Sequence, residues 1–366
     1  MSSGHRIGID ARLYYQTGVG RYIRCLLSEL ASLDKKNDYV IFVTKKDKDL
    51  ITLPVKNFHC ILADFRWHSL AEQVIFPRLL LEHDLDLVHF PYFSLPIFYP
   101  KPFVVTIHDL TPKTHATGKA SALPLPMYSL KRFGYNLVLS QAVNRSCRIL
   151  VPSLATKTIL LSHYPQVQSK ISVTYEGVTV TQGENKKPLV EGEYFLYVGN
   201  AYPHKNIDRL VEAFGKVDGN SKLVLVGEQD YFYKKLKERL GLLKEKQIIF
   251  FGAANDKELA NLYRHALALV FPSLSEGFGL PALEAMAYNC LVIASSIPSL
   301  KEICADTAVY IDPRSEESIY LAMQKVYKDR FAFESYKKKA VERLKIFSWR
   351  KMAKETLSVY ERCTSV

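Results

Sequence analysis

The stretch that most constrains the fold is residues 266–287, where an apolar run ends at Pro272, a loop with Gly277 and Gly279 follows, and a helical pattern begins at Pro281. An apolar run, a glycine loop and a proline-started helix in succession predict one β-loop-α unit. Glycine lets backbone N–H groups come close to a ligand, and the helix start adds partial positive charge. The stretch therefore indicates an α/β fold with a site suited to a phosphorylated ligand.

Two glutamates flank this predicted site. Glu276 lies in the loop before the helix, and Glu284 lies about one turn inside the helix. At that separation they would contact opposite ends of an extended ligand, and they would not share one proton. Taken singly, Glu276 is better explained as a solvated loop residue and Glu284 as an ordinary helix former.

The same stretch reads E-G-F-G-L-P-x-L-E-A-M-A, which resembles the Glu-x7-Glu motif of retaining GT-B glycosyltransferases, a large family whose donors are sugar nucleotides. The resemblance implies that Glu276 lies beside the donor sugar and that Glu284 binds the ribose hydroxyls. Backbone N–H groups of the loop formed by Phe278, Gly279 and Leu280 would then stabilise the leaving diphosphate, as in an oxyanion hole.

Length and composition bound the class of protein. A chain of 366 residues suits two domains of ordinary size. Its start lacks an apolar secretory region, and no apolar run reaches the roughly 18 to 20 residues of a bilayer-crossing helix. The six cysteines are scattered without a C-x-x-C pair, which argues against zinc and against a disulfide framework. We therefore expect a cytoplasmic protein.

The formal net charge of +12 bears on the partners of the chain. A basic surface attracts nucleic acid, anionic lipid or a phosphorylated substrate, and no motif here favours nucleic acid. Residues 123–148 have a mostly helical pattern with lysines and arginines among apolar positions. This pattern favours an amphipathic helix packed on a sheet, and it leaves peripheral association with an anionic membrane open.

The first half opens with a predicted strand at residues 5–11, a loop at 12–19 and a helix at 20–33. Gly18 and Gly20 fall where a phosphate or sugar could approach the helix start. The dinucleotide fingerprint is not met, because the position of its third glycine is an isoleucine. Two glycines alone equally suit a turn, whereas the GT-B resemblance implies a glycine-containing loop that faces the interdomain cleft.

His108 follows the apolar run at residues 102–107. A histidine at the end of a parallel strand faces the usual ligand crevice of an α/β sheet, although it can also cap the strand and bind backbone. This histidine lies in the segment V-V-T-I-H-D, which looks like the GT-B segment whose histidine touches the donor sugar. The resemblance therefore implies a site role for His108, and Asp109 receives no firm role.

The second half begins another β-loop-α unit, with a strand at residues 194–198 and a loop that leads to Lys205 and a helix. The setting of Lys205 resembles that of the basic pair that neutralises the leaving diphosphate in GT-B enzymes, although a lysine before a helix is more simply solvated. Relatives commonly have arginine where this chain has Asn200 and His204. Lys205 would therefore carry the charge alone, with His204, or with Arg209.

Two further strand ends would hold the nucleotide base, as the GT-B resemblance implies. One strand ends at Gly227, and another runs through Phe251 to Gly252. Phe251 equally suits the apolar core. A helical pattern at residues 348–362 ends the chain, and in GT-B proteins the terminal helix crosses back onto the first domain.

Strands alternate with helices in both halves, so we expect two doubly wound parallel-sheet domains facing one another across a cleft, the GT-B fold. The expected bounds are residues 1–178 for the N-terminal acceptor-side domain, 179–192 for a polar linker and 193–347 for the sugar-nucleotide domain. Residues 348–366 would pack back on the first domain.

The resemblance implies a retaining transferase, with Glu276, His108 and Lys205 as catalytic residues, no metal and no cofactor besides the nucleotide sugar. The segments Y-V-G-N-A-Y-P-H-K-N and G-I-D-A-R…T-G-V-G-R-Y look most like bacterial mannosyltransferases of surface-polysaccharide synthesis, which favours GDP-mannose over UDP-sugars. The acceptor would be a glycan or a lipid-linked molecule, and the enzyme would act at the inner face of the membrane. Two alternatives are a sugar-nucleotide epimerase of the same fold and a non-catalytic sugar-nucleotide-binding protein.

Overall fold

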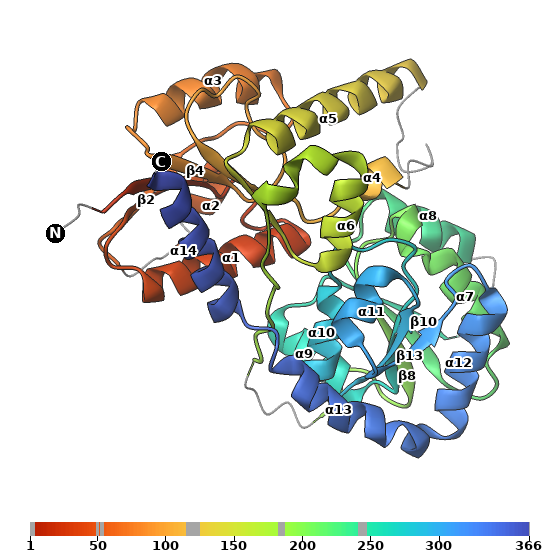
Figure 1. The fold of residues 1–366 in the computed structure, drawn as a ribbon. Coiled ribbons are helices and arrows are strands. Elements are labelled where there is room, and N and C mark those ends of the chain that lie inside the picture. The colour runs from red at the N-terminus through yellow and green to blue at the C-terminus, as the bar shows by residue number, and fades with distance from the viewer. Residues whose placement is uncertain are drawn as a thin grey trace. The chain divides into compact units, whose positions relative to one another are not determined.

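The structure is a computed structural model that describes residues 4–48, 51, 55–114, 125–181, 187–240 and 247–365 (Figure 1). The chain forms two compact units. Unit 1 comprises Met1–Leu110, Ser121–Glu176 and Ser348–Val366, and unit 2 comprises Thr111–Ala120 and Gly177–Phe347. Each unit has one parallel sheet with helices around it, as the alternation of strand and helix patterns predicts.

The sheet of unit 1 has seven parallel strands in the order β3-β2-β1-β4-β5-β6-β7. Strands are added in one direction from β1 to β3 and, after the chain returns to β4, in the other direction to β7. The order therefore reverses between β1 and β4, and ligands of open α/β sheets bind at such a switch point. The strands are β1 (Arg6–Asp10), β2 (Asp38–Val43), β3 (Phe58–Leu62), β4 (Leu87–Phe90), β5 (Phe103–Thr106), β6 (Arg148–Val151) and β7 (Ile171–Val173).

Helices cover this sheet and enclose an apolar core with fully buried rings at Phe42, Phe76 and Phe90. Helix α1 begins at Thr17, so residues 17–19, expected in a loop, are helical. The helices of unit 1 are α1 (Thr17–Leu33), α2 (Lys45–Lys48), α3 (Leu70–Leu81), α5 (Leu125–Arg145), α6 (Leu154–His163), the 3-10 helix η1 (Pro165–Lys170) and α14 (Trp349–Thr364).

The sheet of unit 2 has six parallel strands in the order β10-β9-β8-β11-β12-β13, which reverses between β8 and β11. The strands are β8 (Tyr194–Val198), β9 (Lys222–Val226), β10 (Ile248–Gly252), β11 (Ala268–Phe271), β12 (Leu291–Ser295) and β13 (Ala308–Ile311). The helices are α4 (Thr111–Thr114), η2 (Pro203–Lys205), α7 (Ile207–Lys216), α8 (Tyr231–Leu240), α9 (Asp256–His265), α10 (Leu280–Ala287), α11 (Pro298–Cys304), α12 (Glu316–Lys328), η3 (Arg330–Phe333) and α13 (Glu334–Leu344).

Local signals explain why several helices begin and end where they do. Asn255 caps α9 in a reciprocal capping box with Glu258, and the side chain of Ser348 accepts the backbone N–H of Lys351 at the start of α14. Asn289 follows α10 with φ of 58°, the left-handed conformation that asparagine tolerates after a helix. Asparagine therefore ends this helix in a conformation that usually favours glycine.

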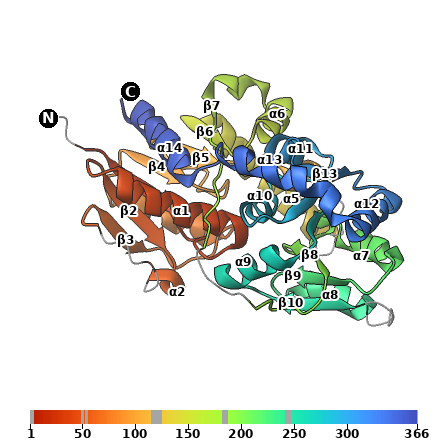
Figure 2. The same cartoon turned by 90° about the horizontal axis from the view of Figure 1, so that it is seen from below.

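The C-terminal helix α14 packs on α1 and against the sheet of unit 1 (Figure 2). Its Tyr360 hydroxyl lies 2.6 Å from Nδ1 of His89 on β4, and Nε2 of His89 lies 2.8 Å from the hydroxyl of Thr106. His89 is fully buried, and burial, with the nearby charge of His108, lowers its pKa from 6.5 to about 3. A neutral imidazole therefore joins the terminal helix to the middle of the sheet.

This lowered pKa predicts that unit 1 loses stability in mild acid. The unfolded chain protonates His89 near pH 6.5, whereas the folded chain resists protonation down to a pKa of about 3. Stability is therefore full above pH 6.5 and falls by up to about 1.4 kcal/mol per pH unit below it. Urea unfolding followed by tryptophan fluorescence measures this slope in unit 1, because Trp67 and Trp349 both belong to that unit. The variant His89→Asn should flatten the slope, and an unchanged slope would assign the acid sensitivity to other groups.

Candidate active site

A largely buried ion pair in unit 2 lies at the carboxyl ends of β8 and β11, where the strand order reverses. Lys205 ends η2 after β8, and Glu276 lies in the loop after β11. Nζ of Lys205 lies 2.6 Å from Oε1 of Glu276, and both side chains are more than four-fifths buried. The two residues predicted to act on different groups of one ligand therefore form an ion pair with each other at the switch point.

Neighbouring backbone contacts hold the two loops together. The backbone N–H of Leu274 donates to the carbonyl of His204 at 2.7 Å. Asn206, with φ of 62°, donates its side-chain amide to the carbonyls of Pro272 at 3.0 Å and Pro313 at 2.7 Å. These hydrogen bonds fix the loop after β8 against the loop after β11, so Lys205 and Glu276 are preorganised.

Gly279 turns the chain from this loop into helix α10. It is the N-cap residue, with φ of 109°, and a Cβ atom there would lie 2.6 Å from Cδ2 of Leu300, so both conformation and space require glycine. Within the described residues no side chain caps this helix start. The ring of Phe278 is buried and packs edge-on against Phe347, so Phe278 can offer only its backbone to a ligand. Leu280 begins the helix and is partly exposed.

Glu284 lies one turn into α10 and is buried. Its Oε2 accepts a hydrogen bond from the hydroxyl of Tyr263 at 3.0 Å, and the ring of Tyr263 stacks on Tyr288 with centroids 5.9 Å apart. A carboxylate has about four acceptor positions, so it can accept further hydroxyl groups. This arrangement suits binding of vicinal hydroxyls, and the ribose role of Glu284 stays a prediction.

The loop after β8 places the two residues that replace the expected arginines. The backbone carbonyl of Asn200 accepts the Tyr197 hydroxyl at 2.7 Å, and its side-chain Oδ1 is buried with no hydrogen-bond partner in the described part of the chain. The ring of His204 stacks on Tyr202 with centroids 6.0 Å apart. Neither residue supplies a permanent cation, so Lys205 is the fixed positive charge of this loop.

Gly227 and Gly252 have structural reasons to be glycine. A Cβ atom on Gly227 would lie 2.2 Å from the carbonyl oxygen of Gly199, so Gly227 permits two strand ends to approach closely. Gly252 has φ of 88°, and its carbonyl accepts the N–H of Gly227 at 3.0 Å. Phe251 is partly exposed and so is not wholly part of the core. The base-binding role of these three residues stays a prediction.

Both ring nitrogens of His108 in unit 1 have protein partners. Nε2 donates to the carbonyl of Pro91 at 2.9 Å, and Nδ1 lies 3.2 Å from Oε1 of Glu176. The ring also packs edge-on against Tyr22 at 4.8 Å. A contact between His108 and a sugar would therefore displace a protein partner or use a C–H edge of the ring, and that role stays a prediction.

The structure corrects the expected glycine loop of unit 1. Gly18 and Gly20 lie in the first turn of α1, because the backbone N–H of Gly20 already donates to the carbonyl of Gln16. A Cβ atom on Gly20 would lie 2.5 Å from the carbonyl oxygen of Tyr14, so this glycine lets the backbone of the preceding loop pack closely against the helix. Gly18 faces open space. The first turn of a helix still offers N–H groups to a ligand.

A buried ionic network at the switch point of unit 1 was not predicted. Arg12, directly after β1, binds Asp10 through Nε at 2.9 Å and through Nη2 at 2.7 Å, and Nη2 also lies 2.8 Å from Oε1 of Glu72 on α3. Ser94, after β4, donates to Glu72. The only sequence signal was an aspartate and an arginine at a strand end, since the pairing with Glu72 spans sixty residues.

Metal binding receives no support from side-chain clusters. Across the described ranges, no group of three or more histidine, cysteine, aspartate or glutamate side chains could hold a metal ion. The proposal of metal independence rests on Lys205 and the start of α10, which together supply positive charge.

Two family models match the chain. The model described as Glycosyl transferases group 1 matches residues 181–343, and the model described as Glycosyltransferase Family 4 matches residues 16–182. Together the two matches span residues 16–343, which include the switch point of unit 2 and begin just after β1 of unit 1.

Two relatives are named as mannosyltransferases. The O-antigen chain mannosyltransferase RfbU of Salmonella typhimurium is 31% identical over 224 residues, which are 61% of this chain and 60% of that protein. The O-antigen chain mannosyltransferase B of Escherichia coli is 27% identical over 382 residues, which cover 95% of this chain and 97% of that protein. The match to the first relative therefore spans less than two thirds of its length.

Solved structures share the fold. Sucrose-phosphate synthase from Thermosynechococcus elongatus has a TM-score of 0.79 at 19% identity, with 99% of both chains covered. HepE of Anabaena, in complex with UDP-glucose, has a TM-score of 0.75 at 15% identity, with 99% of this chain and 100% of that chain covered. At these identities the likeness shows the architecture alone.

Proposed function

We propose a function from one premise: this chain belongs to the glycosyltransferases of group 1 and family 4, and it has the GT-B fold. The proposed reaction moves a hexose, with mannose favoured, from a nucleotide diphosphate sugar to a glycan or lipid-linked acceptor with retention of configuration. GDP-mannose is favoured over UDP-sugars as the donor, because two relatives that match this chain are named mannosyltransferases.

The observation that carries the proposal is the Lys205–Glu276 pair at the switch point of unit 2, beside the start of α10. A diphosphate at this point would meet the lysine ammonium and the partial positive charge of the helix start. Glu276 would then accept hydrogen bonds from the donor sugar, and Glu284 from the ribose. This placement supplies positive charge where the leaving group gains negative charge.

The proposed chemical step needs no separate nucleophile. The bond between the anomeric carbon and the diphosphate oxygen breaks, and the acceptor oxygen forms its bond to the same face of that carbon. The acceptor proton passes to the leaving diphosphate, whose charge Lys205 and the helix start stabilise. A contact of His108 with the donor sugar is part of the proposal. Comparison of the anomeric configuration of donor and product tests this step, and an inverted product would reject it.

A panel of GDP- and UDP-sugars, with and without membrane extract, tests the reaction. We expect release of nucleoside diphosphate from GDP-mannose to depend on an acceptor. Binding of a sugar nucleotide without turnover on any acceptor would favour a binding protein. Conversion of the donor sugar to its epimer without transfer would favour an epimerase.

We also propose that unit 1 docks on an anionic membrane through an apolar surface, which would place the enzyme at the inner face of the membrane. None of the helices in the described ranges combines the length and apolarity that a bilayer crossing requires. Large apolar side chains nevertheless stand at least half exposed along α3, α5 and the segment after β4. These are Leu70, Val74, Ile75, Phe98, Met127, Leu130 and Phe133, which we call the apolar surface.

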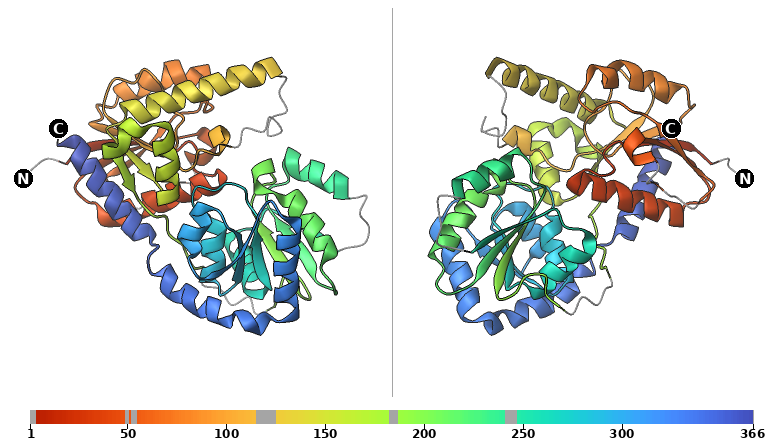
Figure 3. Two further views of the ribbon diagram at one scale, coloured as in Figure 1. Left: turned by 45° about the vertical axis from the view of Figure 1, so that its right-hand side comes forward. Right: turned by 180° about the vertical axis from the view of Figure 1, so that it is seen from behind.

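The segment after β4, which carries Phe98, is hydrogen-bonded to both α3 and α5. Gln73 of α3 donates to the carbonyl of Leu95 at 3.1 Å and accepts the N–H of Ile97 at 3.0 Å. Arg145 of α5 donates to the carbonyl of Tyr99 at 2.6 Å. Figure 3 shows α3 and α5 together along one side of unit 1 in both views. Exposed apolar patches of this extent usually mark an interaction surface.

Charge selects an anionic membrane as the occupant of this surface. Lys131 and Arg132 are exposed on α5 between Leu130 and Phe133, and the chain carries +12 overall. Each basic residue close to an anionic bilayer contributes about 1 kcal/mol of attraction. Exposed apolar side chains with basic neighbours in this part of α5 suit contact with an anionic lipid surface.

The double variant Leu130→Ser/Phe133→Ser is expected to bind vesicles that contain phosphatidylglycerol at least about tenfold more weakly than the wild type, because two apolar side chains leave the interface. Co-sedimentation measures this. The matched control is Leu321→Ser/Phe331→Ser, which removes an exposed leucine and an exposed phenylalanine from unit 2 and should bind as the wild type does. Equal loss in both pairs, or no binding by the wild type, would reject the proposal.

A further inference from the structure

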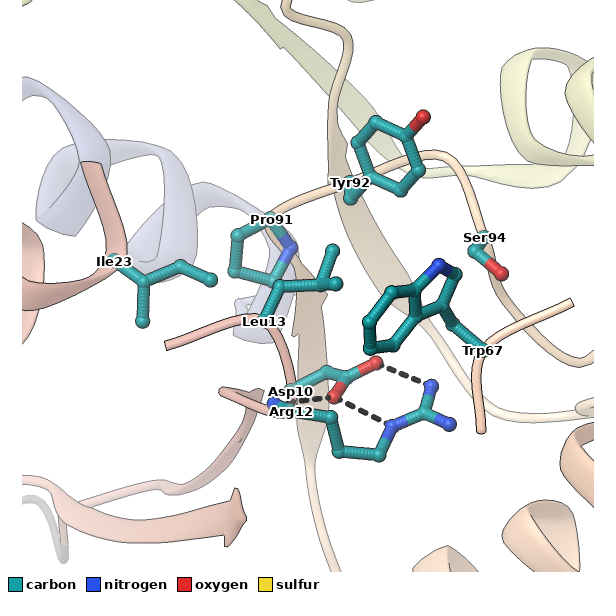
Figure 4. Close-up of a pocket in the computed structure, with 8 residues that line it drawn as sticks. All are labelled: Asp10, Arg12, Leu13, Ile23, Trp67, Pro91, Tyr92 and Ser94. Carbon is teal, nitrogen blue, oxygen red and sulfur yellow. Dashed lines mark hydrogen bonds and ion pairs between the residues drawn. The ribbon is translucent and has the colours of Figure 1, made fainter. Parts of the chain in front are cut away.

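A small pocket opens at the switch point of unit 1, between the ends of β1 and β4. It is lined by Asp10, Arg12, Leu13, Ile23, Trp67, Pro91, Tyr92 and Ser94 (Figure 4). We propose that this pocket takes a hydroxyl group of an uncharged acceptor sugar, with the ring of that sugar on Trp67. The inference rests on the proposed transferase function and names the acceptor class that unit 1 recognises.

The floor of the pocket is a fixed hydrogen-bond acceptor. Both carboxylate oxygens of Asp10 are held by Arg12, at 2.9 Å from Nε and 2.7 Å from Nη2. The guanidinium itself packs over the ring of Phe76 at 4.2 Å. A carboxylate has about four acceptor positions, so Asp10 keeps capacity for a hydroxyl donor from a ligand. Because Arg12 already fixes the Asp10 carboxylate, this side chain loses little conformational entropy when a hydroxyl group binds to it.

The charges of the network select an uncharged ligand. Arg12 carries one positive charge, whereas Asp10 and Glu72 carry two negative charges, and all three side chains are almost wholly buried. A phosphate or carboxylate in contact with Asp10 would therefore meet the net negative charge of this buried network, whereas an uncharged hydroxyl group would not be repelled. His68, whose ring lies beside Ser94, adds no cation at neutral pH, because burial lowers its pKa.

The walls of the pocket suit the apolar face of a sugar ring. Trp67 lies over the pair of Asp10 and Arg12 in Figure 4 and is partly exposed, while Leu13 and Pro91 form the opposite side. A pyranose ring presents C–H bonds on one face and hydroxyls at its edge. An aromatic wall with a few fixed polar groups is the usual composition of a small-molecule site.

The size of the pocket limits what enters it. The enclosed space is about that of one water molecule, so a single hydroxyl group enters while the ring stays on the aromatic wall. The strand order places this pocket in unit 1 at the position that the Lys205–Glu276 pair has in unit 2: both lie beyond the carboxyl ends of the strands at a reversal of order. One switch point would then serve the acceptor, and the other the donor.

Direct binding tests the pocket, because Trp67 is one of only two tryptophans in the chain. Trp349→Phe removes the other, whose indole N–H has no hydrogen-bond partner among the described residues, and leaves Trp67 as the only reporter. Titration of this full-length variant with methyl mannoside should give a saturable change in fluorescence. Mannose 6-phosphate should bind at least about tenfold more weakly, because the network repels it. No saturable change, or tighter binding of the phosphate, would overturn the proposal.

Kinetics separate this inference from the proposed function. Trp67→Ala should raise the KM for the acceptor by at least about tenfold and leave the KM for the donor unchanged. Circular dichroism and thermal unfolding establish that the variant folds, and Tyr15→Ala, which removes another exposed ring from unit 1, is the control. Wild-type acceptor KM in Trp67→Ala would refute the pocket while the transferase stands. Saturable binding at Trp67 in a protein that transfers no sugar would refute the transferase while the pocket stands.

Discussion

Lys205→Met is expected to lower kcat for sugar transfer by about 10²- to 10³-fold, the usual loss when a preorganised group that stabilises a leaving charge is removed. Methionine keeps most of the length of the side chain and removes its charge. Nζ of Lys205 now lies 2.6 Å from Glu276 at the switch point of unit 2. Its loss leaves the diphosphate without its fixed cation and leaves Glu276 without its partner. Steady-state rates of nucleoside diphosphate release measure the effect.

A surface ion pair in the same unit supplies the control. Lys216 lies 2.9 Å from Glu316, and its side chain is half exposed. Lys216→Met removes a lysine–glutamate pair of similar length away from both switch points, so kcat should stay within about twofold of the wild type, because exposed pairs contribute little. Equal values of kcat for Lys205→Met and the wild type would mean that Lys205 does not stabilise the leaving diphosphate.

The two partners should behave as one group in a double-variant cycle. Glu276→Ala is expected to abolish transfer and leave the fold intact, and Lys205→Met/Glu276→Ala should be little slower than the slower single variant. Losses that multiply in the double variant would mean that the two side chains act on separate parts of the reaction. The ion pair would then belong only to the ligand-free state.

Much of the fold could be predicted because central strands of parallel sheets are apolar on both faces and appear as continuous runs. The predicted strand at residues 194–198 is β8 with the same bounds, and it lies inside the sheet of unit 2. Strand β3 (Phe58–Leu62) was not predicted, because it is an edge strand with only one fully buried residue. The start of α1 was placed late because its first turn contains two glycines, which ordinarily mark a loop.

The sequence singled out candidate site residues, but it did not predict which of them pair. Glu276 and Lys205 stood out through the motif and the loop that contain them, yet the sequence gives no sign that these side chains, 71 positions apart, bind each other. The partners of His108 were not predicted for the same reason, since Glu176 lies 68 positions away. Local patterns report which residues share an element, and only the packing of the sheet reports which loops meet.

Arg12→Met is expected to destabilise unit 1 by about 3 to 5 kcal/mol, the usual loss when one partner is removed from a buried ion pair. The reason is that the substitution leaves two buried carboxylates without their counter-ion. Asp10 and Glu72 are both buried, and Arg12 is the cation that contacts each of them. Urea unfolding followed by tryptophan fluorescence measures the loss, because both tryptophans belong to unit 1.

Charge, and not packing, should dominate this loss, and two variants separate the two causes. Arg12→Met/Asp10→Asn/Glu72→Gln removes the stranded charges along with the cation, so it should be more stable than Arg12→Met alone. Arg350→Met breaks an exposed pair with Glu29, 3.6 Å apart in the same unit, and should cost less than about 1 kcal/mol. A loss of similar size in Arg12→Met, or a triple variant less stable than the single one, would show that the guanidinium acts through its packing on Phe76 and not as the counter-ion of the network.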